Sequence, residues 1–132
     1  MQWIDDILDH GMILNAHDEL LIKTTREYGT KLWLMSLAGE GEYCNPSVEN
    51  ITREVFLAME ILVDELYRGS DTGLKVSSVK IHETPNCAST CLYESISDLE
   101  RKRFYKAKEK EIRAYARKMG KLEYDDRKID KK

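Results

Sequence analysis

The chain has 132 residues, 42% hydrophobic and 34% charged, which suits a single domain with a modest core. Its net charge of −3 conceals an asymmetry, because residues 1–100 carry 7 Lys/Arg against 18 Asp/Glu and residues 101–132 carry 14 against 6. No stretch approaches the roughly 18 consecutive apolar residues that a membrane span needs. Three cysteines without a secretory leader exclude a disulfide framework and predict a reducing, cytoplasmic location.

The first third of the chain alternates short predicted elements. Residues 1–10 have apolar side chains at helical spacing and predict an amphipathic helix, which is marginal at this length without packing partners. Residues 15–18 are typical of a loop, and residues 19–28 predict a short helix. The apolar run at residues 31–37 predicts a strand, followed by a glycine-marked turn.

A long helix beginning near Asn45 is the strongest secondary-structure prediction. Pro46 suits a first helical turn, with Asn45 or Ser47 as the N-terminal cap. The apolar residues recur every three or four positions, at Val48, Ile51, Val55, Met59, Leu62 and Leu66. Burying each large side chain of this stripe is worth roughly 1.5–3 kcal/mol, so we expect it to face a sheet.

Residues 75–83 alternate as a strand does, and the chain then turns back through Ala88 to Tyr93. Strict alternation places Val79, Ile81 and Glu83 on one face. A carboxylate at the end of an apolar face is unusual. Glu83 either lies beyond the edge of the core, in solvent, or serves a function.

The last third is basic and predicted to be helical. Ser97 and Glu100 form a capping-box pattern that begins a helix running to about Met119. The last dozen residues are expected to be disordered because they are strongly charged. We therefore divide the chain into a domain at residues 1–96 and a basic helical tail at residues 97–132.

Three short motifs lie in order on these elements. The first is Leu8-Asp9-His10, followed by Leu14-Asn15; the second is Pro46-Ser47-Val48-Glu49-Asn50; the third is Val79-Lys80-Ile81-His82-Glu83-Thr84-Pro85. Together they resemble the 6-pyruvoyltetrahydropterin synthase / 6-carboxytetrahydropterin synthase family over residues 1 to about 94. In that family the second motif reads Pro-Thr-x-Glu-Asn and the third ends in Glu-Thr-Pro. The bacterial branch, which makes 6-carboxytetrahydropterin for the queuosine and 7-deazaguanine pathway, is the closer match.

The resemblance implies a zinc-dependent lyase that acts on 7,8-dihydroneopterin triphosphate and forms homo-oligomers with active sites between subunits. It implies that Glu83 binds the pterin, since one carboxylate accepts both adjacent N–H donors of the 2-amino-4-oxopyrimidine edge. It also implies that Asp9 and His10 are catalytic and transfer protons on the substrate side chain. Without the resemblance, this pair is simply a dipeptide at a helix C-terminus, where the helix dipole favours a cation.

The chain departs from the family in its metal ligands. The family's three zinc-binding histidines and its catalytic cysteine belong to a β-hairpin that precedes the Asp-His helix, whereas the histidines here are His10, His17 and His82. Cys44, Cys87 and Cys91 do not match the family's cysteine position, and Cys87 and Cys91 do not have a standard zinc spacing. We therefore interpret the cysteines as structural or incidental. We therefore expect an N-terminally truncated α+β domain with a tunnelling-fold type antiparallel sheet, helices packed on one face, and a C-terminal basic helix. Missing strands would leave a sheet edge and a helix face uncovered and favour oligomerisation.

Two functional hypotheses follow. The first is the pterin lyase, with a small-molecule pterin substrate. The second is a non-catalytic remnant or binding module that keeps the pterin anchor and interacts through its basic tail. The simplest interpretation of residues 101–132 is a solvated helix face. The alternatives are docking onto the acidic body of a neighbouring subunit and contact with nucleic acid, and the latter lacks a recognisable binding module.

Overall fold

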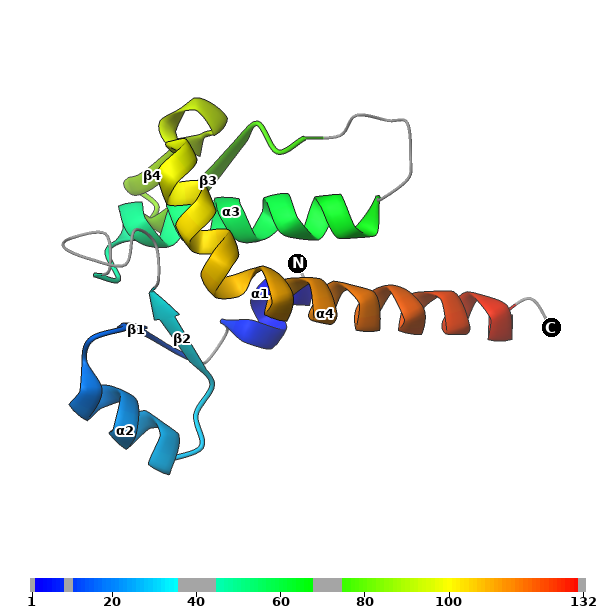
Figure 1. The fold of residues 1–132 in the computed structure, drawn as a ribbon, viewed down its shortest axis with the longest axis horizontal. Helices are drawn as coiled ribbons and strands as arrows, with labels where there is room; N and C mark the ends of the chain where they lie inside the picture. Colours follow the sequence, from blue (N-terminus) through cyan, green and yellow to red (C-terminus); the bar gives the residue numbers. More distant parts are fainter. Residues whose placement is uncertain (1, 9–10, 36–44, 68–74, 131–132) are drawn as a thin grey trace.

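The computed structural model describes residues 2–8, 11–35, 45–67 and 75–130 and confirms the α+β class (Figure 1). Its elements in order are α1 (Gln2–Ile7), β1 (Met12–Asn15), α2 (Glu19–Glu27), β2 (Leu32–Met35), α3 (Val48–Leu66), β3 (Ser78–Thr84), β4 (Cys87–Leu92), the 3-10 helix η2 (Tyr93–Ser95) and α4 (Asp98–Asp130). No helix within the described residues has the length and apolar content to cross a membrane.

The strands form two small sheets. β1 pairs with β2 in parallel, with Met12 opposite Leu32 and Asn15 opposite Met35, and α2 provides the crossover that parallel pairing requires. β3 and β4 form an antiparallel hairpin. Strand β1 differs from the prediction from the sequence, which includes no strand here and places Asn15 in a loop. The tunnelling-fold arrangement of the sheet stays a prediction.

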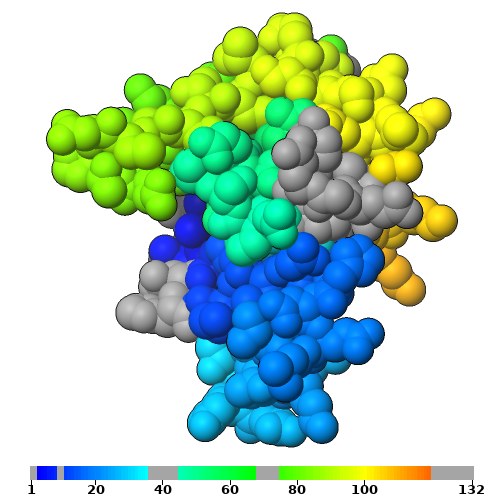
Figure 2. Space-filling model, turned by 90° about the vertical axis from the view of Figure 1, so that its left-hand side faces the viewer, coloured from blue at the N-terminus to red at the C-terminus, as the bar shows by residue number. Residues whose placement is uncertain are grey.

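Helix α3 lies between the two sheets. The β3–β4 hairpin lies on one side of it, and α1, β1 and β2 lie on the other (Figures 1 and 2). Ser47 is the N-cap, and its hydroxyl accepts a hydrogen bond from the backbone N–H of Asn50 at 3.2 Å. Because α3 is covered on several sides, its buried surface is wider than the predicted stripe and includes Phe56, Leu57 and Ile61.

The basic helix α4 packs on α3. Phe104, Ile112 and Ala116 of α4 are buried in the same core as Phe56 and Ile61 of α3. The expectation of an uncovered helix face is therefore wrong for the described part of α3. The division of the chain at residues 96 and 97 stays a prediction.

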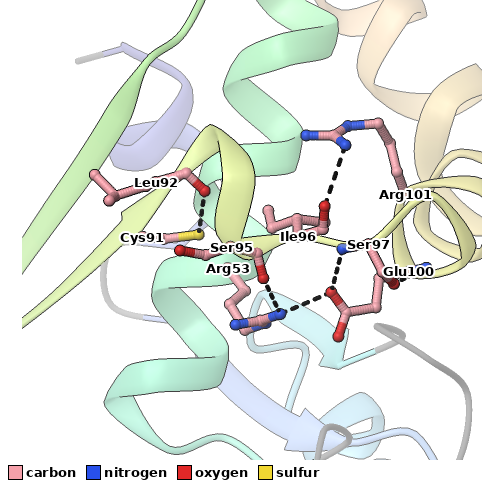
Figure 3. Close-up of polar contacts among 8 residues, drawn as sticks. All are labelled: Arg53, Cys91, Leu92, Ser95, Ile96, Ser97, Glu100 and Arg101. Carbon is pink, nitrogen blue, oxygen red and sulfur yellow. Dashed lines mark hydrogen bonds and ion pairs between the residues drawn. The ribbon is translucent and has the colours of Figure 1, made fainter.

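The predicted capping box is present at the start of α4 (Figure 3). Ser97 donates its backbone N–H to Glu100 Oε2 at 3.0 Å, and Glu100 donates its own N–H to Ser97 Oγ at 3.2 Å. Arg53 of α3 joins this junction, because Arg53 Nη2 donates to the carbonyl oxygen of Ser95 at 2.8 Å and to Glu100 Oε2 at 2.7 Å. These bonds attach the beginning of α4 to the middle of α3.

Helix α4 is longer than predicted. It extends to Asp130, so the disorder expected for the last dozen residues is wrong over residues 121–130. Gly120 therefore does not end the helix, which continues through residues 121–130.

Helix α1 has the packing partners that its short length requires. The Trp3 ring meets the Trp33 ring edge to face, with centroids 5.4 Å apart. The Trp33 indole donates to Glu54 Oε1 at 2.9 Å, and Lys108 Nζ of α4 lies 4.0 Å from the centre of the same ring. Helices α1, α3 and α4 thus meet at Trp33 of β2.

Candidate functional site

Glu83 lies at a β-bulge near the turn of the β3–β4 hairpin. His82 is opposite Ala88 and Thr84 is opposite Cys87, so β3 advances two residues while β4 advances one, and Glu83 is the additional residue. Its side chain is exposed rather than continuing the inner face of the strand. Bulges re-aim side chains, and this one presents the carboxylate to solvent at the hairpin tip.

The thiol of Cys87 is the neighbour of that carboxylate. Cys87 Sγ donates to Glu83 Oε2 across 3.7 Å, a weak hydrogen bond between exposed groups. Cys91, four residues further along β4, is buried in the core and lies 3.7 Å from the carbonyl oxygen of Leu92 (Figure 3). A carboxylate oxygen has two lone pairs, so Glu83 keeps acceptor capacity for a ligand.

The predicted catalytic residues, Asp9 and His10, lie outside the described residues. Their described neighbours are α1, which ends at Ile7, and β1, which begins at Met12. The expectation that the core brings them close to Glu83 stays a prediction.

The first and second sequence motifs meet at the beginning of α3. Asn15 Nδ2 donates to Asn45 Oδ1 at 2.9 Å, and Asn50 Nδ2 donates to the carbonyl oxygen of Asn45 at 3.1 Å. The side-chain oxygen of Asn15 also accepts the backbone N–H of His17 at 2.8 Å. These amides join the end of β1 to the cap of α3, which gives both motifs a structural role.

The described residues do not fit a zinc site. His17 follows β1 and His82 lies on β3, and both are exposed. In the part of the chain that the structure describes, no three His, Cys, Asp or Glu side chains gather in a way that would hold a metal ion. We therefore derive no chemical step through zinc.

A second candidate site, which sequence reasoning missed, lies between α3 and α4. It is a cleft of about 430 Å³ whose lining includes Glu60, Tyr93, Arg101 and Tyr105. Arg101 donates Nε to Glu60 Oε1 at 2.9 Å and Nη2 to Glu60 Oε2 at 3.3 Å, and its guanidinium lies 4.6 Å from the centre of the Tyr93 ring. Burial raises the pKa of Tyr105 to about 12 from the ordinary value of 10.0, so its phenol stays a neutral hydrogen-bond donor. No sequence pattern marks this site, because its residues come from separate elements.

Comparison with known proteins identifies the family. A family model described as 6-pyruvoyl tetrahydropterin synthase matches residues 1–94, which include all three motifs and Glu83 but not α4. Neither a curated protein nor a solved structure matches the chain. Since the match spans 94 of 132 residues, the chain belongs to the 6-pyruvoyl tetrahydropterin synthase family, a family of lyases of pterin metabolism.

Proposed function

We propose that the chain is a 6-carboxytetrahydropterin synthase-type lyase, which converts 7,8-dihydroneopterin triphosphate in queuosine and 7-deazaguanine biosynthesis. The observation that carries the proposal is the exposed Glu83 carboxylate, which stands at a bulge inside the range matched by the family model. The proposal includes a homo-oligomer in the cytoplasm, on the grounds of the family resemblance and the cysteine content.

In this proposal Glu83 holds the pterin ring. The 2-amino-4-oxopyrimidine edge presents two parallel N–H donors, and an ionised carboxylate accepts one on each oxygen. Such charge-assisted bonds are roughly twice as strong as neutral ones and fix the plane of the ring.

Asp9 and His10 take the proton-transfer role. A neutral histidine removes a proton from the substrate side chain, and the resulting imidazolium returns it at a neighbouring atom. The Asp9 carboxylate would stabilise the cationic form of the imidazole during that interval. Glu83 would keep the ring still while the protons move.

The second candidate function is a pterin-binding module without catalysis. The finding that favours it is the lack of a metal-binding cluster among the residues that the structure describes. A binding module needs Glu83 but neither zinc nor the Asp9-His10 pair. Both candidates therefore predict pterin binding through Glu83, whereas only the lyase predicts turnover.

The shared prediction concerns Glu83→Gln. Glutamine replaces one carboxylate oxygen with an N–H₂ group, which faces an N–H donor of the pterin. We therefore expect the affinity for pterin, measured through the fluorescence of the pterin ring, to fall at least about tenfold. Glu94→Gln, which removes another exposed carboxylate, is the control and should leave binding unchanged. Equal affinity of Glu83→Gln and the unchanged chain would contradict the anchor role.

Turnover separates the two candidates. The lyase should convert 7,8-dihydroneopterin triphosphate and contain close to one zinc ion per chain by elemental analysis, with activity lost in His10→Ala. A module should bind pterin but show no turnover and no zinc. Binding without turnover would therefore select the second candidate and reject the first.

A further inference from the structure

Two neighbouring clefts along α4, which together we call the groove, lie at the opposite end of the hairpin from Glu83. The cleft between α3 and α4 contains Tyr93, whose backbone N–H donates to the carbonyl oxygen of Ser77 where β3 and β4 open out. A second cleft of about 420 Å³ lies further along α4, and the two share Tyr105 and Arg113 in their lining. Both volumes fall in the range of about 300–1,000 Å³ that is usual for small-molecule sites.

The two halves of the groove differ in chemistry. The first half offers an aromatic ring: Tyr93 remains 41% exposed, although the Arg101 guanidinium lies over its face, and Val63 and Val76 add apolar surface. The second half is basic, since its lining includes Lys106, Lys110 and Arg117. An aromatic group suits the first half and anionic groups suit the second.

Arg113, which lines both halves of the groove, is held in place by ion pairs within the chain. Arg113 pairs with Asp64 at 2.8 Å, Glu65 at 2.8 Å and Glu109 at 2.9 Å, so its donors already have partners. The lysines differ, because within the described residues no carboxylate forms an ion pair with Lys106 or Lys110. These two ammonium groups, four residues apart on one helix face, are the charges that a ligand can neutralise.

We propose that this groove binds a nucleoside polyphosphate. The heterocycle stacks against Tyr93, and the phosphates lie on Lys106 and Lys110. The neutral phenol of Tyr105 stands between the two halves, within the lining of both, and donates a hydrogen bond to the ligand. The site is separate from the proposed pterin anchor and does not depend on it.

The test is calorimetric titration of the full chain with ATP, adenosine and inorganic triphosphate. ATP should bind at least about tenfold more tightly than either part, because only ATP occupies both halves. The double variant Lys106→Ala/Lys110→Ala should weaken ATP binding at least tenfold. Tyr93→Ala should weaken the binding of ATP but not that of triphosphate.

Two controls locate the site. Lys102→Ala removes an exposed charge of α4 outside the groove, and Glu83→Gln alters only the hairpin tip; both should bind ATP as the unchanged chain does. The proposal is overturned if ATP does not bind at millimolar concentration or if triphosphate binds as tightly as ATP. It is equally overturned if Lys102→Ala or Glu83→Gln weakens ATP binding as much as the double lysine variant does.

Discussion

The phenol of Tyr115 donates a 2.6 Å hydrogen bond to Asp6 Oδ2, which joins two helices whose residues are 109 positions apart. Burial and this bond raise the pKa of Tyr115 well above its usual value. We expect Tyr115→Phe to lower the free energy of unfolding by about 1 kcal/mol in urea denaturation. Tyr28→Phe, at a side chain 83% exposed, is the control and should change it by less than about 0.5 kcal/mol. Equal stability of the two variants would show that α1 docks without this bond.

We expect the docking of α4 to depend on the buried side chain of Phe104. Phe104 is fully buried against α3, so Phe104→Ala should cost about 3–5 kcal/mol through lost burial and a cavity. Leu99→Ala, five residues earlier on the same helix and 59% exposed, should cost far less. Thermal and urea unfolding measure the loss of stability of both variants. A small effect at Phe104 would mean that α4 contributes little to the core.

Glu65 makes the contact between α3 and α4 sensitive to acid. It accepts hydrogen bonds from Arg117 Nε at 2.6 Å and Arg113 Nη1 at 2.8 Å, and these hold its pKa below the ordinary value of 4.5. Because the pKa is lower in the folded state, the stabilisation is complete above pH 4.5 and is lost as the pH falls through the lowered pKa.

Glu65→Gln should therefore be less stable than the unchanged chain near neutral pH, and the difference should shrink in acid. Urea denaturation at about pH 6 and about pH 3 measures it. Glu27→Gln, which removes an exposed carboxylate of α2, serves as the control. A difference of the same size at both pH values would contradict an ionic role for Glu65.

The two described cysteines should differ sharply in reactivity. Cys87 is exposed and should react with a thiol reagent in the folded chain, whereas Cys91 is buried and burial raises its pKa. In a Cys44→Ser background we expect one thiol to react at once and the other only at the rate of unfolding. Rapid reaction of both would mean that β4 opens in the native state, and Cys91→Ser would identify which thiol reacts first.

Local signals in the sequence predicted the helices well. The Ser47 cap and the pairing of Ser97 with Glu100 depend on residues three positions apart, so the sequence alone reveals them. The strand Met12–Asn15 differs from the prediction because its last residue falls in the predicted loop at residues 15–18, and its pairing partner lies beyond the α2 crossover. The length of α4 is also not evident from the sequence, because a strongly charged composition is typical of disorder.

The candidate sites differ in how far sequence reveals them. Glu83 was found through the family resemblance, but strict alternation placed it on the inner face, whereas a bulge set by the hairpin register presents it to solvent. The groove beside Tyr105 was not foreseeable, because α3, η2 and α4 contribute separate parts of it. Asp9 and His10 remain predictions from the resemblance.

The burial of Phe104, Ile112 and Ala116 against α3 also sets when the nascent chain can complete its core. A ribosome adds about 5–20 residues per second, so several seconds separate the synthesis of α3 from that of Ala116. During that interval the α3 residues that α4 later buries remain exposed to solvent. A chain that stops before Phe104 would therefore keep this apolar surface of α3 uncovered and would be prone to associate through it.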